Sequence, residues 1–245
     1  LTFTGILLSL FEIVDRFGAS PMLLFKSYFG ANIPSTGFSF TGGPFVSALF
    51  LGVVATMLVV KVVTQRTKGQ EKVLTGLYAA LIGAGLLSCL FLFLPGKATQ
   101  PQFLPQSAAW NVAVDTLKDG KTALFGVGPD NYINAFSSFR PVSLNQTKFW
   151  QVRFESSRSG ILHFLTTQGV VGLGIYILLI VTIGKNVWSV QKESYPVLAG
   201  LFLTIAFSFL FPFSVLSLSL AALLTVVLIS DLKGQEKLVQ HSFLF

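Results

Sequence analysis

Long apolar runs without charged residues alternate along this chain with short polar segments. The runs contain no Asp, Glu, Lys or Arg and cover residues 44–60, 73–94, 160–183, 195–211 and 215–229. A helix needs about 20 predominantly apolar residues to cross the hydrocarbon core of a bilayer. The pattern therefore predicts five transmembrane helices. Residues 1–14 are also apolar and indicate either the remainder of an earlier span or an interfacial helix.

The composition supports a membrane location. Only 11% of the 245 residues are charged and the mean hydropathy is +0.72, whereas a soluble domain carries about 25% charged residues. We therefore predict an all-α, polytopic transmembrane helix bundle that forms one membrane domain over residues 1–245. The chain begins at Leu1 and its first methionine is Met22, from which we expect the C-terminal part of a longer protein.

The charged connections predict the orientation of the spans. Lysine and arginine outnumber acidic residues in the short segments 61–72 and 184–194, and short basic loops stay in the cytoplasm. Alternating spans then place residues 95–159 outside the cytoplasm. This long connection carries a net charge of +3. That excess fits an anionic ligand, but an ordinary solvated surface has a similar charge.

The long connection is predicted to contain short helices. Residues 107–118 have the spacing of an amphipathic helix, with Ser107 as its cap and Trp110, Val114 and Leu117 on one face. Asp119–Gly120 is predicted to end this helix. A turn at 126–129, rich in glycine and proline, is then followed by a second short helix.

Few residues of this chain suit a metal or redox site. Cys89 is the only cysteine and there are two histidines, so the sequence excludes disulfides, zinc fingers and iron–sulfur clusters. A histidine-based metal centre is not expected either. We predict no metal, no other cofactor and no nucleic-acid partner.

A polar stripe leads into the predicted span that begins at Gly160. Glu155, Ser159 and His163 follow one another at helical spacing, and Thr166 or Thr167 continues the series. A polar stripe that enters the bilayer should face the bundle or a wet cavity, because lipid cannot satisfy its hydrogen bonds. The stripe therefore predicts the floor of a pocket at the outer leaflet. The alternative is hydrogen bonding between helices.

Three segments in order resemble a known family. They are Trp110, the stretch FGVGPDNYINAF at 125–136 and the stretch LTTQGVVGLGIY at 165–176. This arrangement resembles the O-antigen ligase and O-antigen polymerase superfamily over roughly residues 34–230. The resemblance implies a metal-independent glycosyltransferase, multi-pass in the bacterial inner membrane. Such an enzyme moves a glycan from undecaprenyl diphosphate to a hydroxyl of an acceptor glycan, lipid or protein at the outer face.

The chain departs from the family at two places. Members carry a His–Asn pair eleven and ten residues before the glycine that corresponds to Gly169, and Arg158 and Ser159 stand there in this chain. The family's arginine just before the tryptophan is also absent. These departures leave catalysis open.

The expected chemistry still indicates candidate residues. A leaving diphosphate needs cations, and the arginine fork binds phosphate oxygens in pairs, so Arg140, Arg153 and Arg158 are the predicted diphosphate ligands. Alternatively, these arginines anchor the helix at the lipid head groups. Glu155 or His163 is the predicted catalytic base for the acceptor hydroxyl.

Two other functions compete with the transferase. One is a non-catalytic membrane scaffold of the same fold, favoured by the missing His–Asn pair. The other is a polysaccharide transporter, against which the predicted spans contain no Asp, Glu, Lys or Arg for ion coupling and the chain shows no internal repeat. In each case membrane lipids surround the protein.

Overall fold

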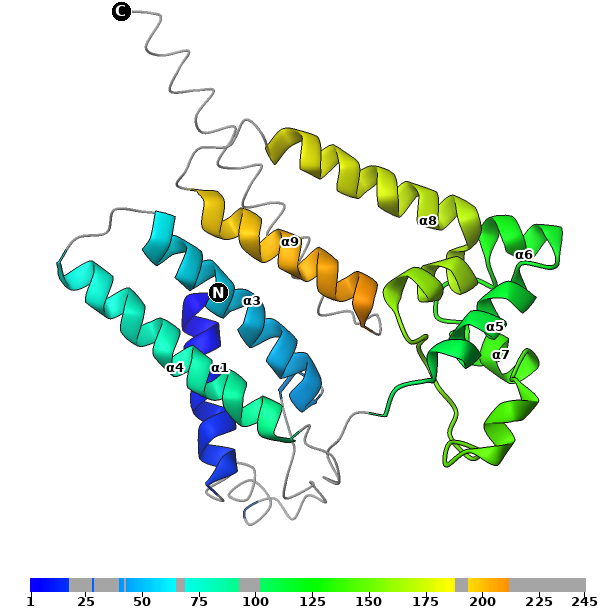
Figure 1. Ribbon diagram of the computed structural model, residues 1–245, viewed down its shortest axis with the longest axis horizontal. Coiled ribbons are helices and arrows are strands. Elements are labelled where there is room, and N and C mark those ends of the chain that lie inside the picture. Colours follow the sequence, from blue (N-terminus) through cyan, green and yellow to red (C-terminus); the bar gives the residue numbers. More distant parts are fainter. Residues whose placement is uncertain are drawn as a thin grey trace, which may run out of the picture. The chain divides into compact units, whose positions relative to one another are not determined.

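The computed structural model describes residues 1–17, 28, 40–41, 43–64, 69–92, 102–187 and 194–211, and every regular element within them is a helix (Figure 1). The chain divides into two compact units. The first contains the described residues of 1–101 and 190–204, and the second contains those of 102–189 and 205–217. The predicted all-α class is confirmed for the described residues.

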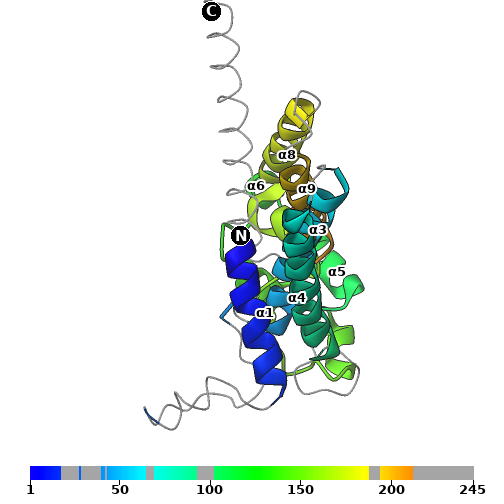
Figure 2. The ribbon, with the colours of Figure 1, turned by 90° about the vertical axis from the view of Figure 1, so that its left-hand side faces the viewer.

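Three helices lie wholly within the described residues of the first unit: α1 (Thr2–Arg16), α3 (Pro44–Thr64) and α4 (Gln70–Leu92). The helices α3 and α4 correspond to the first two predicted spans, and both are long and apolar enough to cross a membrane. The helix α1 packs against α4 and α3 (Figure 2). Residues 1–14 thus belong to a helix that is part of this bundle.

Small residues bring α1 close to α4. A Cβ atom at Gly85 would lie 2.6 Å from the Cβ of Ser9, and a Cβ atom at Gly5 would lie 3.1 Å from a methyl group of Val54. Close approach through glycine and serine is typical of membrane helices, which gain dispersion energy and not hydrophobic burial when they associate. The same interface buries Glu12, whose Oε1 accepts a 2.7 Å hydrogen bond from the hydroxyl of Ser47.

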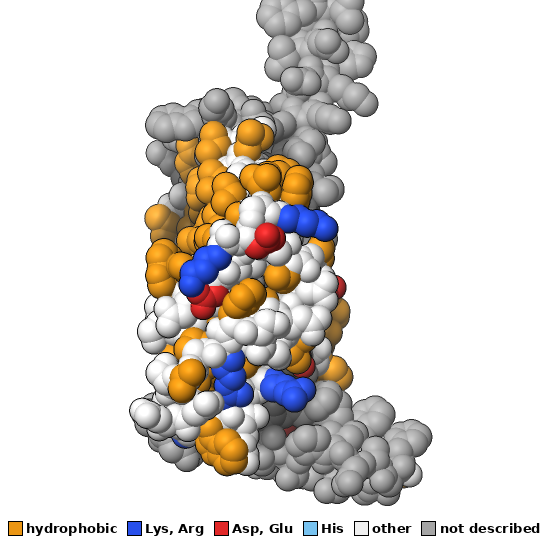
Figure 3. Space-filling view, turned by 90° about the vertical axis from the view of Figure 1, so that its right-hand side faces the viewer, with side chains coloured by type: hydrophobic (Ala, Val, Ile, Leu, Met, Phe, Trp, Pro, Cys, Tyr) orange, Lys and Arg blue, Asp and Glu red, His pale blue; other side chains and the backbone are white. Residues whose placement is uncertain are grey.

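The second unit contains short helices followed by one long helix. The helices are α5 (Gln106–Thr116), α6 (Gly120–Phe125), α7 (Tyr132–Ser138), the 3₁₀ helix η1 (Val142–Gln146) and α8 (Gly160–Val187). The α5, α6 and α7 helices all pack against α8. Figure 3 shows one face of this unit, on which charged side chains are dispersed among uncharged groups and hydrophobic side chains gather toward the top.

The buried face of α5 differs from the predicted one. Ala109, Val112 and Ala113 are fully buried, whereas Trp110 is 56% exposed and Val114 is 37% exposed. The prediction gave weight to the largest apolar side chains. Here, small side chains occupy the core because they allow α5 to approach its neighbours closely.

The ends of α5 also differ from the prediction. The helix begins at Gln106 after Pro105, so Ser107 lies inside it and does not cap it. It ends at Thr116, before Asp119–Gly120. Asp119 instead caps α6, because its carboxylate accepts a 3.1 Å hydrogen bond from the N–H of Thr122.

Long apolar helices in the described residues support a membrane protein. The segment Gly160–Thr182 of α8 is the third helix long and apolar enough to cross a membrane, as the sequence predicts. The helix α9 (Tyr195–Leu210) coincides with the fourth predicted span but has only 16 residues. The fifth predicted span, 215–229, lies outside the described residues. The extracytoplasmic position of residues 95–159 stays a prediction.

Candidate functional site

The helix α8 is interrupted near its beginning. Gly169 has φ 67° and ψ −167°, which is not a helical conformation and divides α8 into a short first part and a longer second part. This region of backbone conformation is essentially restricted to glycine. The interruption removes the normal partners of the carbonyl groups that precede it, so these groups need other donors.

The glycine-rich turn after α6 supplies these donors. The N–H of Val127 donates to the carbonyl of Thr166 at 3.1 Å, and the N–H of Gly128 donates to that of Thr167 at 2.9 Å. Gly126 has φ 69°, and a Cβ atom there would lie 2.2 Å from the backbone of Thr167. The turn at 126–128 and the break at Gly169 therefore form one interlocked structure, which explains why both segments contain glycine.

The same turn positions the start of α7. Asp130 adopts φ 59°, a left-handed conformation that glycine, asparagine and aspartate tolerate best. The side chain of Asn131 then donates a 3.2 Å hydrogen bond to the carbonyl of Val127. This sequence of contacts directs Tyr132, the first residue of α7, into the unit's interior.

Tyr132 lies at the centre of a buried polar cluster that also contains Ser157 and His163. The Tyr132 ring is fully buried and stacks on the His163 ring, with centroids 5.3 Å apart and an angle of 28° between the planes. Among the described residues, neither the Tyr132 hydroxyl nor the buried Ser157 hydroxyl has a hydrogen-bond partner of normal geometry. Burial raises the pKa of Tyr132 to about 12, although the neighbouring Ser157 acts in the opposite direction.

Arg158 follows Ser157 directly. Its guanidinium carbon lies 4.5 Å from the centroid of the Phe103 ring, which is the distance of a cation–π contact. Its Nη1 atom is buried and has no hydrogen-bond partner among the described residues. Arginine stays charged in proteins, so this cation lies immediately before α8 with its face against Phe103 and one buried nitrogen that lacks a hydrogen-bond partner among the described residues.

The other two predicted diphosphate ligands have different surroundings. The Nη2 of Arg140 donates to the carbonyl of Phe149 at 3.2 Å and to that of Trp150. Its guanidinium also lies 5.7 Å from the centroid of the Phe136 ring. Arg153 is exposed. No contact in the described residues joins these arginines to each other, and none of the three pairs with a described carboxylate.

The predicted polar stripe is only partly on the helix. Because α8 begins at Gly160, Glu155 lies in the preceding loop, where it is exposed. Ser159 stands at the start of the helix, and its hydroxyl accepts a 3.4 Å hydrogen bond from the N–H of Leu162. The hydroxyls of Thr166 and Thr167 donate to carbonyls four residues earlier in α8, at 2.8 and 2.7 Å. The two threonines are thus satisfied within their own helix.

Tyr132 and Ser157 are the residues that the sequence alone does not identify. Tyr132 belongs to the stretch 125–136 that carries the family resemblance, but a tyrosine at the start of a short helix gives no sign of burial. Ser157 is one of several serines in a polar segment. Their importance depends on the folding of α7 against α8, which places two hydroxyls away from water and from partners.

No protein-family model matches the chain, and neither does any curated protein or solved structure. Within the described residues, no group of three or more His, Cys, Asp or Glu side chains is placed to hold a metal ion. The candidate site consists of Tyr132, which neighbours Ser157 and stacks on His163, and of Arg158, which follows Ser157 in the chain and contacts the Phe103 ring. We call these four residues the buried polar cluster.

Proposed function

We propose that the chain belongs to a membrane glycosyltransferase that moves a glycan from undecaprenyl diphosphate to an acceptor hydroxyl at the outer face of the bacterial inner membrane. The main support is the buried polar cluster at the beginning of α8. Native proteins leave few buried polar groups without hydrogen bonds, and those that remain unsatisfied are frequently functional. The hydroxyls of Tyr132 and Ser157 are two such groups that lie near each other, and the Nη1 of Arg158, the next residue along the chain, is a third.

The position of the cluster suits a lipid-linked diphosphate. It lies where a loop enters a helix long enough to span a membrane. We propose that this end of the helix lies at the depth of the head groups. In the transfer, the acceptor oxygen bonds to the anomeric carbon while the bond from that carbon to the diphosphate oxygen breaks. Negative charge develops on the leaving diphosphate, and a fixed cation stabilises it. We assign this role to Arg158, with exposed Arg153 as a second ligand.

Arg140 has the weakest case among the three arginines. Two backbone carbonyls already accept hydrogen bonds from its Nη2 atom. Binding a diphosphate through the same atom would leave these carbonyls without their donor, although the bond to Phe149 is only part-buried and that to Trp150 is exposed to solvent. Arg140 remains a predicted ligand, and its conservative variant tests that role.

The acceptor hydroxyl must lose a proton during transfer. His163 is the better placed of the two predicted bases, because its ring stacks on Tyr132 inside the buried polar cluster. Glu155 is exposed in the loop before α8 and would act only by turning toward the cluster. The Tyr132 hydroxyl can donate a hydrogen bond to an oxygen of the substrate, since its raised pKa keeps it protonated at neutral pH.

A scaffold without catalytic activity is the second candidate. The observation in its favour is that Arg158 and Ser159 stand where the family has its His–Asn pair. A transporter gains less support. Broken helices bind ions or substrates in transporters through free backbone carbonyls, but the turn at 126–128 already uses the carbonyls of Thr166 and Thr167.

Transfer of a lipid-linked glycan by membranes that contain the full-length protein tests the proposal. Arg158→Lys should lower the rate at least tenfold, because lysine lacks the planar fork. Arg66→Lys, in a predicted cytoplasmic loop, is the matched control and should keep the wild-type rate. Tyr132→Phe should also lower the rate without loss of expression, because it removes the hydroxyl and leaves the buried ring and its stacking on His163 in place.

The outcomes separate the two candidate functions. A wild-type protein that inserts normally but transfers no glycan would support the scaffold. Full activity of Arg158→Lys and Tyr132→Phe would show that the buried polar cluster has no part in the reaction. Arg140→Lys should retain most of the activity if Arg140 only holds the backbone. A loss as large as that of Arg158→Lys would restore Arg140 as a ligand.

A further inference from the structure

We infer that α6 binds lipid: the side chains of Leu124 and Phe125, at its C-terminal end, enter the bilayer beside the break in α8. Both side chains are large and apolar, and they are 50% and 63% exposed. None of the six residues of α6 is buried. The helix therefore adds no side chain to the core of the second unit, and its apolar end needs another apolar environment.

The burial of α8 changes at Gly169. Before the break, side chains of the helix are packed into the unit, among them Leu162 and Phe164. From 170 to 182, none of the described side chains is buried, and Leu178 is 68% exposed. The break thus divides α8 into a part that the protein covers and a part whose apolar side chains are open.

The open part of α8 has the properties of a surface in contact with lipid. It contains no charged residue from 170 to 182. The two polar side chains described there already have hydrogen bonds. Tyr176 pairs with Ser208 at 2.8 Å, and Thr182 donates to a carbonyl of its own helix at 2.8 Å. Residues 170–187 extend over about 27 Å at 1.5 Å per residue, which is nearly the thickness of the hydrocarbon core, about 30 Å.

The end of α6 lies beside the break (Figure 1). A Cβ atom at Gly169 would lie 2.4 Å from the carbonyl oxygen of Leu124 and 2.7 Å from the nitrogen of Gly126. Leu124 and Phe125 are therefore next to the first open residues of α8 and continue its apolar surface. Lipid that covers the open part of α8 reaches the end of α6 as well.

The composition of α6 suits the boundary between hydrocarbon and head groups. Lys121 is exposed and precedes Leu124 and Phe125 by three and four residues, so the three side chains share one face of the helix. A cation one turn away from an apolar end matches the anionic phosphates next to the hydrocarbon. The turn that follows can also lie close to lipid, because the N–H groups of Val127 and Gly128 are bonded to carbonyls of α8.

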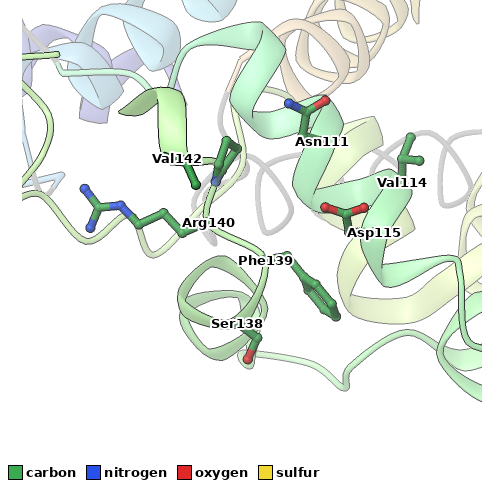
Figure 4. Close-up of a pocket in the computed structure, with 8 residues that line it drawn as sticks. Asn111, Val114, Asp115, Ser138, Phe139, Arg140 and Val142 are labelled. Atoms are coloured by element: carbon green, nitrogen blue, oxygen red, sulfur yellow. The ribbon is translucent and has the colours of Figure 1, made fainter. Parts of the chain in front are cut away.

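Other exposed apolar side chains of the unit have different neighbours. Phe139 and Val142 are 36% and 79% exposed, but they line a hollow together with polar and charged residues (Figure 4). Asn111, Asp115 and Arg140 belong to that lining. Lipid at this place would remove water from these groups. Val142 is therefore the matched control for an apolar side chain that faces water.

Electron paramagnetic resonance of the full-length protein in liposomes of phosphatidylcholine and phosphatidylglycerol tests the lipid contact. Leu124→Cys and Phe125→Cys each carry a nitroxide label in a Cys89→Ala background. Oxygen concentrates in lipid and a nickel chelate stays in water, so the ratio of their collision rates with the label reports its surroundings. This ratio should exceed that of Val142→Cys by about threefold or more, because the two reagents partition between apolar and aqueous surroundings. It should approach the ratio of Leu178→Cys on the open part of α8.

Two results would overturn the lipid contact. Collision with the nickel chelate as frequent as at Val142→Cys would show that the end of α6 faces water. Low collision rates with both reagents would show that protein covers it, such as a second copy of the chain. A carbene reagent dissolved in the bilayer repeats the test without any substitution, and mass spectrometry should locate its label on Leu124 and Phe125. Neither measurement involves glycan transfer, so failure of the proposed function would leave the lipid contact unaffected.

Discussion

Replacing Gly169 by alanine tests whether the break in α8 and the turn at 126–128 form one unit. A Cβ atom at position 169 would lie 2.4 Å from the carbonyl oxygen of Leu124 and 2.7 Å from the nitrogen of Gly126. Both neighbours are backbone atoms, so no side chain can move aside. The backbone must shift, and the hydrogen bonds from the turn to Thr166 and Thr167 must weaken.

The expected cost has two parts. Holding a non-glycine residue at φ 67° and ψ −167° costs about 1–3 kcal/mol. Fitting the extra methyl group into a packed site costs about 1–3 kcal/mol more. Proteins are stable by only about 5–15 kcal/mol, so Gly169→Ala should remove a large part of the stability of the second unit. Gly126→Ala, at φ 69°, should have a similar effect.

Denaturation in detergent, followed by tryptophan fluorescence, measures this loss. Trp110 and Trp150 both report on the second unit. Gly174→Ala is the matched control on the same helix, because a Cβ atom there meets no atom within 4 Å. It should raise stability by up to about 1 kcal/mol through helix propensity.

The two destabilising changes affect one shared contact, so their effects should not add. The double variant should lose clearly less stability than the sum of the single variants. Wild-type stability of Gly169→Ala would refute the interlocked structure, and so would full additivity of the two changes. An equal loss in Gly174→Ala would show that any methyl group on this helix is harmful.

Three further predictions follow from single positions. Asp130→Val should cost about 1–2 kcal/mol of unfolding free energy because of the positive φ, whereas Asp130→Gly should cost nothing; thermal unfolding of both variants compares them. The folded-state pKa of Tyr132 is about 12 against an ordinary 10, so the unfolded state releases this proton first and stability should fall as the pH rises between these values. Tyr132→Phe should remove that decline in alkaline unfolding curves and leave stability near neutral pH unchanged. Single cysteines at Thr99 and Thr67, in a Cys89→Ala background, should react with an impermeant thiol reagent from outside and inside respectively; labelling from one side only would contradict the topology.

The sequence by itself determined the features that depend on neighbouring residues. Three predicted spans, 44–60, 73–94 and 160–183, coincide with helices because the length of an uncharged apolar run is a local property. The turn at 126–129 and the helix after it were also predictable, since glycine and proline act within a few residues.

Other features depend on contacts between distant segments, and only the tertiary structure decided them. The break at Gly169 lies inside a run without charged residues that predicts one continuous span, and the turn at 126–128 supplies hydrogen bonds to the carbonyls that precede the break. The packing of α7 against α8 likewise buries Tyr132 and Ser157. The burial of Glu12 is likewise not predictable from its neighbours in the sequence, because its partner Ser47 lies 35 positions away.

The arginines show most clearly that contacts between distant segments cannot be predicted from the sequence. In sequence Arg140 and Arg158 are equivalent cations of the long connection. In the structure the Nη2 of Arg140 donates to two carbonyls and its Nε is buried without a partner among the described residues, whereas Arg158 contacts the Phe103 ring and its Nη1 is the buried atom without a partner. A residue type fixes which bonds a side chain is able to form. Whether the fold already uses those bonds depends on the packing of segments far apart in the chain, because hydrogen bonds act only over a few ångströms.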